Sequence, residues 1–160
     1  MSGVIGLSPN MKSGRIGFYH PGHIIKQTHG ESFTGNNDIT STEYSASGLT
    51  LACTFTPGNK IWIVASVWVG AWNGGDDTGT YFKFYDETNG VDLGPTDDTY
   101  SYVHAQGGTA GWEGMHPFSL MYTPPSGTSI TFQVYHKVPW GGTSRVDRRR
   151  SMITLNEVQV

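Results

Sequence analysis

The sequence has little charge and almost no cysteine. Lys, Arg, Asp and Glu together make up 14% of its 160 residues, well below the roughly one quarter that is usual in globular domains. The one cysteine, Cys53, cannot form a disulfide within the chain, so stability has to come from packing or from oligomerisation. Because Cys53 falls on the apolar side of a predicted strand, we interpret it as a small core residue.

Several partners and locations are disfavoured. The net charge of −3 argues against nucleic acid as the main partner, because binding phosphates requires a basic surface. The most apolar run, residues 61–72, is too short for a membrane-spanning helix, so we expect no membrane insertion. The N-terminus lacks a basic segment followed by an apolar one, which predicts a soluble protein made in the cytoplasm without a signal peptide.

Familiar catalytic and metal-binding motifs are also missing. There is no G-x-S-x-G, P-loop, H-E-x-x-H or C-x-x-C, so we predict neither an enzyme nor a bound cofactor. His20 and His23 offer two imidazoles for zinc, which usually takes four ligands. Asp76 and Asp77 offer loop oxygens for calcium or carboxylates for glycoside hydrolysis. Surface and packing roles explain these residues better, and we predict no metal site.

Glycine, serine, threonine and aromatic residues are plentiful, with 22 glycines and 12% aromatics. This profile favours an all-β domain with many turns. Turn signals separate about eight to nine strand-sized segments, which predicts an antiparallel β-sandwich or jelly roll. We expect strands near residues 23–28, 40–45, 48–56, 60–72, 79–86, 100–105, 115–123, 129–138 and 151–159.

The segment 48–69 predicts two strands joined as a hairpin by a tight turn at Pro57-Gly58-Asn59. The first strand alternates apolar and polar residues, as a strand with one buried face does. The second is apolar on both faces, since Trp62, Val64 and Trp68 lie opposite its aliphatic row. We expect the second strand to be central or to face a symmetry-related subunit through Trp62 and Trp68.

Residues 1–22 have no strand or helix period, yet they keep apolar side chains that free disordered tails usually lack. We interpret them as an extended arm that docks onto another surface; an ordinary frayed terminus is the alternative. Residues 23–160 would then form the sandwich domain.

Aromatic side chains gather in the turn-rich segments. Trp72, Tyr100, Tyr102, Trp112 and Trp140 lie close in sequence to Asp, Asn, Gln or Gly residues. Rings beside such polar groups suit a sugar-binding surface, and they are also common at protein interfaces. The alternative is that they cap the ends of the sandwich or pack against neighbouring subunits.

A short basic run precedes the last predicted strand. Arg145, Arg148, Arg149 and Arg150 could pair with acidic loops of a neighbouring subunit, bind an anionic surface or remain solvated. We favour pairing between subunits, because the guanidinium fork binds carboxylates with two hydrogen bonds.

Four segments resemble β-sandwich modules in virion proteins of tailed bacteriophages, notably marine and cyanobacterial ones. They are His23–Thr28 (HIIKQT) with the Ser/Thr-rich stretch 41–45, the pattern G-L-T-L…T-F-T-P…N-K-I over 48–61, S-I-T-F-Q-V-Y over 129–135, and I-T-L-N-E-V over 153–158. The resemblance covers about 135 residues. It implies a homotrimeric, non-enzymatic module that decorates the particle or adsorbs to host-surface glycans, and it brings no catalytic residues.

The expected function is therefore that of a virion structural protein of fibre, spike or decoration type, made in the host cytoplasm. Residues 1–22 would attach it to a capsid, tail or adaptor protein. The alternative is a standalone carbohydrate-binding module, and a small hydrolase is a third reading.

Overall fold

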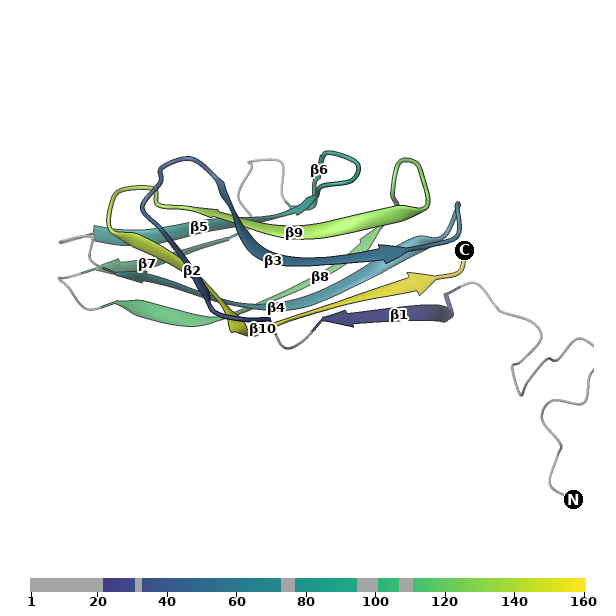
Figure 1. Cartoon of the computed structure of the whole chain (residues 1–160), viewed down its shortest axis with the longest axis horizontal. Helices are drawn as coiled ribbons and strands as arrows, with labels where there is room; N and C mark the ends of the chain where they lie inside the picture. The colour runs from purple at the N-terminus through teal and green to yellow at the C-terminus, as the bar shows by residue number, and fades with distance from the viewer. Residues whose placement is uncertain (1–21, 31–32, 73–76, 95–100, 107–110) are drawn as a thin grey trace, which may run out of the picture.

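The computed structural model describes residues 22–30, 33–72, 77–94, 101–106 and 111–160. Within them, ten strands form two stacked five-stranded antiparallel sheets, which confirms the predicted all-β sandwich (Figure 1). The strands are β1 (Ile24–Gly30), β2 (Asn36–Ile39), β3 (Ser45–Thr54), β4 (Lys60–Trp72), β5 (Asp77–Asp86), β6 (Val91–Asp92), β7 (Ser101–Gln106), β8 (Trp112–Tyr122), β9 (Ser129–Lys137) and β10 (Thr143–Val158). In these residues the structure holds no helix that could cross a membrane.

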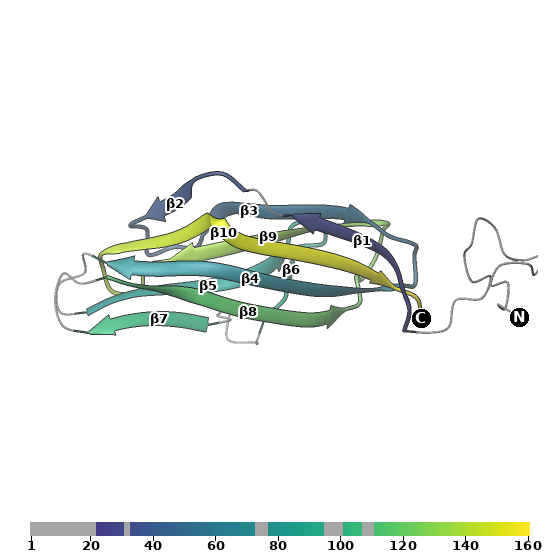
Figure 2. The ribbon, with the colours of Figure 1, turned by 90° about the horizontal axis from the view of Figure 1, so that it is seen from below.

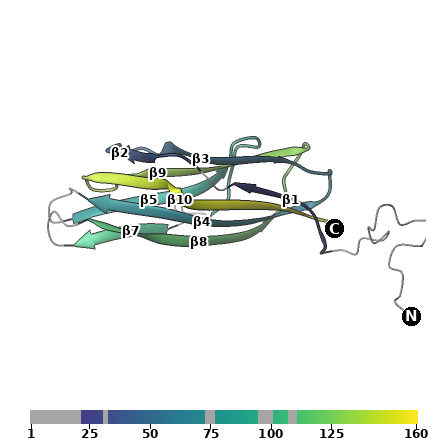
Figure 3. The same ribbon diagram turned by 60° about the horizontal axis from the view of Figure 1, so that its bottom comes forward.

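Strands β8, β4 and β10 run side by side in sheet A, and β1 and β2 share the far edge of β10 (Figure 2). Sheet B has the order β3, β9, β5, with β6 and β7 sharing the far edge of β5. Figure 3 shows β1 and β2 at the two ends of the long β10. The chain changes sheet at most connections after β3, which is the winding of a jelly roll.

The core lies between the inward rows of the two sheets. Along β4 the side chains of Ile61, Ile63 and Val67 are fully buried. Phe84 of sheet B stacks on Phe132 at a centroid distance of 5.4 Å and meets Phe118 of sheet A at 4.0 Å. Removing this much apolar surface from water is the main term that stabilises the sandwich.

The predicted hairpin over 48–69 is wrong, although both of its strands exist. Strand β3 pairs with β9 in sheet B, whereas β4 lies in sheet A between β8 and β10. The turn therefore links the two sheets, so that the apolar rows of β3 and β4 face the same core. The Glu157 carboxylate fixes the turn by accepting hydrogen bonds from the Thr56 amide and from Asn59 Nδ2, both at 2.7 Å.

Two further strand predictions need correction. The expected strand at 40–45 is mostly a connection, in which Ser41 Oγ accepts a hydrogen bond from the Glu43 amide. The preceding residues 36–39, which contain turn-type asparagines, form β2 because they pair with β10. The last strand begins at Thr143 rather than near 151, and an irregularity between Asp147 and Met152 interrupts its pairing with β4.

A buried histidine links the two sheets. His136 of β9 has no exposed surface, and its Nδ1 lies 2.7 Å from Ser144 Oγ of β10. Its Nε2 lies 2.6 Å from Asn37 Oδ1 of β2. Burial lowers the pKa of His136 to about 4, so the ring is neutral in the folded protein at neutral pH.

The stability of the domain should therefore fall as the pH falls from 6.5 to 4, because the unfolded chain protonates His136 and the folded chain does not. The lowering of the His136 pKa corresponds to a decrease of about 3 kcal/mol in the free energy of unfolding once the pH is below both pKa values. Urea unfolding at pH 7 and pH 4.5 measures this loss. His136→Gln, which cannot titrate, should lose about 2–3 kcal/mol less than the wild type over that interval. Equal losses in both proteins would show that the histidine is not buried neutral.

Candidate functional surfaces

The outer face of sheet A is apolar along its centre. The outward residues of β4 face those of β8 in register: Trp62 opposite Met121, Val64 opposite Ser119, Ser66 opposite Pro117, and Trp68 opposite Met115. We call this set, together with Met152 of β10, the tryptophan face. Because these residues alternate with the buried aliphatic row, the two-sided apolar pattern of residues 60–72 corresponds to one core face and one outer face.

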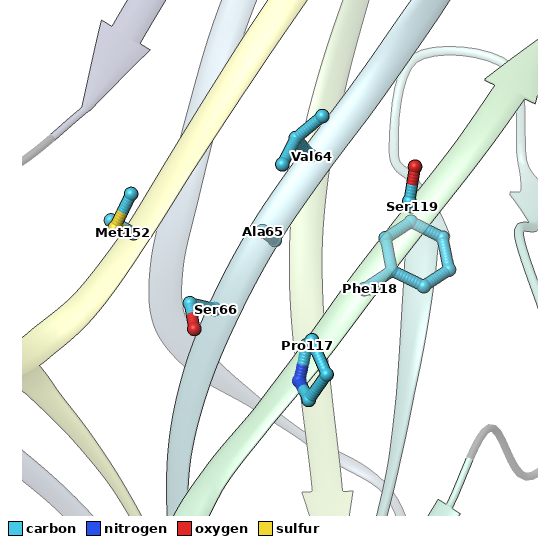
Figure 4. A pocket seen from close by; sticks show the side chains of 7 residues that line it. All are labelled: Val64, Ala65, Ser66, Pro117, Phe118, Ser119 and Met152. Atoms are coloured by element: carbon cyan, nitrogen blue, oxygen red, sulfur yellow. The ribbon is translucent and has the colours of Figure 1, made fainter.

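A shallow hollow of about 490 Å³ lies on the tryptophan face. Figure 4 shows Ser66 of β4 between Met152 of β10 and Pro117 of β8, with Val64 further along β4. Exposed methionines at Met115, Met121 and Met152 leave much of this face apolar and open to solvent in the single chain.

The two tryptophans of this face differ in how far the chain covers them. Trp62 is 37% exposed, and its Nε1 donates a hydrogen bond to Ser119 Oγ at 3.0 Å. Trp68 is half-buried because the Arg150 guanidinium lies over its ring, 4.8 Å from the centroid. Neither ring is wholly buried within one subunit, so a second molecule has surface to cover on both.

The arginine run lies against partners in its own chain. Arg145 binds Asp38 with two hydrogen bonds of 2.6 and 2.7 Å and covers the Trp72 ring at 4.1 Å. Arg149 donates to Asp147 at 3.3 Å, and Arg150 donates to Glu113 at 3.2 Å. The Arg145 pair joins β10 to β2, and the Arg149 and Arg150 pairs lie at the irregular part of β10. Pairing between subunits remains a prediction.

Arg148 points a different way from its neighbours. Its Nη2 donates to the Asn36 carbonyl at 3.4 Å, and its guanidinium lies against Gly35 and Gly48. Gly48 has a φ of +73°, and a Cβ added there would lie 2.8 Å from Arg148 Nη1. The glycine therefore supplies both the left-handed backbone and the space for this side chain.

Among the five aromatic residues proposed from the sequence as ligand-binding, the three tryptophans, whose side chains the structure describes, lie on different surfaces. Trp72 lies on the outer face of sheet A under Arg145, whereas Trp112 projects from the opposite side of that sheet, 5.8 Å from His116. Trp140 contacts Tyr81 of sheet B at 5.7 Å. The Tyr102 backbone pairs with Tyr81 in the β5–β7 ladder, and Tyr100 lies outside the described residues.

The outer face of sheet B carries a tyrosine-rich surface that the sequence analysis missed. Tyrosine and lysine side chains alternate here along and across the strands. On β5 and β9, Tyr81 lies opposite Lys137, Lys83 opposite Tyr135, and Tyr85 opposite Gln133. Tyr44 covers both lysines, Trp140 adjoins Tyr81, and Glu87 and Asp92 lie at the β5–β6 end. We call Tyr44, Tyr81, Lys83, Tyr85, Glu87, Asp92, Tyr135, Lys137 and Trp140 the tyrosine surface.

This surface is built from defined contacts rather than loose side chains. Tyr85 and Tyr135 meet edge to face at 5.7 Å, and the Tyr135 hydroxyl donates a hydrogen bond to Glu87. That bond raises the pKa of Tyr135 to about 12. Lys83 Nζ lies 2.9 Å from Asp92. Six of the residues line an open hollow of about 370 Å³: Tyr44, Lys83, Tyr85, Glu87, Asp92 and Tyr135.

The signal for this surface was present in the sequence as a period of two. Tyr81, Lys83 and Tyr85 alternate with Phe82 and Phe84, and Tyr135 and Lys137 alternate with Val134. Ligand binding was predicted for turn segments, and these strand residues were given no role. No group of three metal-binding side chains occurs in the described ranges, and His20 and Asp76 lie outside them.

No protein-family model and no curated protein matches the chain. Among solved structures, it is similar to Eiger TNF from S. frugiperda at 8% identity and a TM-score of 0.46, over 86% of this chain and 94% of that one. It is similar to the enzymatically active domain of tailspike protein 4 from bacteriophage CBA120 at 10% identity and a TM-score of 0.36, over 87% of this chain and 18% of that one. It is also similar to the CBM22-1 xylan-binding domain of Paenibacillus barcinonensis Xyn10C at 13% identity and a TM-score of 0.34, over 89% of this chain and 99% of that one. At these scores, function has to be argued from the side chains of this chain itself.

Replacing Gly48 by alanine should destabilise the domain more than the same change at Gly58. Both glycines have positive φ, at +73° and +92°, which costs an alanine about 1–2 kcal/mol. Only at Gly48 does the new methyl group also displace Arg148, because nothing lies within 4 Å at Gly58. Denaturant unfolding of both variants measures the difference, and equal losses would contradict the placement of Arg148.

Proposed function

We propose that this protein is a non-enzymatic display protein of a bacteriophage particle, which binds host-surface saccharides through the tyrosine surface. The observation that carries the proposal is the alternation of tyrosine rings and ammonium groups on the outer face of sheet B. Tyrosine and tryptophan rings stack on the C–H faces of sugars, and neighbouring charged groups hydrogen-bond sugar hydroxyls. The open hollow of about 370 Å³ beside Tyr85 and Tyr135 has room for one sugar residue, and Tyr81, Lys137 and Trp140 continue the same face next to it for another.

The virion assignment is supported by the resemblance of the strand and turn motifs to tailed-phage sandwich modules. In the proposal, residues 1–22 attach the domain to a capsid, tail or adaptor protein. Gly22 and His23 pair with Gln159, so Gly22, the first described residue, lies at the end of the sandwich where the C-terminus lies. Figure 1 shows the β9–β10 turn, which carries Trp140, at the opposite end. This arrangement points part of the tyrosine surface away from the attachment.

The tryptophan face supports assembly with further copies of the chain, with a homotrimer as the expected state. It lies on sheet A, while the tyrosine surface lies on sheet B, so assembly would leave the saccharide surface free. Apolar area of this kind, centred on an exposed tryptophan, is typical of protein interfaces.

A glycan array probed with the wild type and two tryptophan variants tests saccharide binding. Trp140 is 54% exposed on the tyrosine surface, whereas Trp112 is 42% exposed elsewhere. Trp140→Ala should weaken binding of the recognised glycan roughly tenfold, as expected for the loss of a stacked ring. Trp112→Ala should leave it unchanged. A wild type that binds no glycan, or equal losses in both variants, would refute the assignment to this surface.

Light scattering at micromolar concentration tests assembly. The wild type should be a trimer, and Trp62→Arg should give a smaller species, because a charge on the tryptophan face cannot be buried without a partner. Trp112→Arg is the matched control and should keep the wild-type mass. A monomeric wild type would favour the alternative of a standalone carbohydrate-binding module.

A further inference from the structure

The two lysines of the tyrosine surface differ in their partners. Lys83 Nζ lies 2.9 Å from Asp92, and only 15% of its side chain is exposed. Lys137 Nζ lies 4.2 Å from the centroid of Tyr44 and 5.8 Å from that of Tyr81. In the described ranges, aromatic rings are the only partners of the Lys137 ammonium group, so no carboxylate there neutralises it.

The ring of Tyr44 holds both ammonium groups on one side of the sheet. Lys83 Nζ is 4.8 Å from its centroid and Lys137 Nζ is 4.2 Å from it. Each cation is attracted by the ring, but among the described side chains only Lys83 also has a carboxylate, that of Asp92, beside it. An anion placed beside Lys137 would supply the missing counter-charge and a charge-assisted hydrogen bond.

The acidic groups lie toward the other end of the surface and are already engaged. Glu87 accepts the hydrogen bond from the Tyr135 hydroxyl, and Asp92 pairs with Lys83. The end formed by Lys137, Tyr81 and Trp140 therefore combines one ammonium group with two rings that meet edge to face at 5.7 Å.

We infer that the saccharide bound by the tyrosine surface is acidic, and that Lys137 binds its negative group while Tyr81 and Trp140 contact the sugar ring. The inference rests on the proposed saccharide binding. The ligand class is a sugar that carries a carboxylate, as in uronates and sialates, or a sulfate ester. Because the whole chain has a net charge of −3, general attraction of polyanions cannot replace this local contact.

The test uses an array of matched oligosaccharides that differ only in the acidic group. The pairs are oligogalacturonate with its methyl ester, sialyllactose with its methyl ester, and a sulfated with an unsulfated galactoside. The wild type should prefer at least one acidic member over its neutral partner by about tenfold, the size of one hydrogen bond to a charged group. The carboxylate and sulfate pairs separate the two sources of charge.

Three lysine variants identify the group responsible. Lys137→Met keeps an unbranched side chain without the charge and should reduce acidic binding to the level of the neutral partner, while Lys137→Arg should retain the preference. Lys60→Met removes the same charge from the sheet A side of the sandwich and should change nothing.

Each other outcome has a defined meaning. Equal binding of acidic and neutral members, or a preference that survives Lys137→Met, would overturn the inference and leave saccharide binding standing. A preference lost equally in Lys60→Met would show a general charge effect and would also overturn it. If the wild type bound no member of the array, the proposed function and the inference would both fail.

Discussion

The contact between the inward phenylalanine rings of the two sheets is the interaction on which the rest of the molecule depends. Phe84 of sheet B packs on Phe118 of sheet A and on Phe132 of its own sheet, and all three rings are buried. Side chains alternate along a strand, so when one set points into this core the residues between them point outward. The core therefore fixes which residues lie on the outer faces, but it does not fix their side-chain chemistry.

The outer faces of the two sheets differ in their side-chain chemistry. Sheet A presents the exposed apolar side chains of Trp62, Met121 and Met152. Covering them with another apolar surface lowers the free energy of the system. Sheet B presents tyrosine hydroxyls and lysine ammonium groups, which stay hydrated while their rings and stems offer contact area. A face of the first kind suits permanent association, and a face of the second kind suits exchange with a soluble or surface-bound ligand.

Local alternation made the fold class predictable, since residues 48–56 and 129–138 each alternate apolar and polar side chains. The same pattern could not show that β3 and β4 belong to different sheets, because a turn at Pro57–Asn59 serves a hairpin and a sheet-to-sheet link equally well. The tyrosine surface was missed for a related reason. Its residues come together only when β5 pairs with β9, which lie about fifty residues apart in sequence.

The arginines of β10 and Lys137 of β9 differ in the partners that the described chain gives them. Arg145 pairs in register with both β2 and β4, whereas Arg150 lies in the irregular stretch of β10 between Asp147 and Met152. Each has a carboxylate of its own chain and a tryptophan ring as partners. Diverting the Arg150 contacts to a ligand would loosen β10 where its pairing with β4 is interrupted. Lys137 pairs in regular register with Tyr81 of β5 and has rings but no carboxylate as partners among the described residues. Its charge can therefore meet an external anion without cost to the fold.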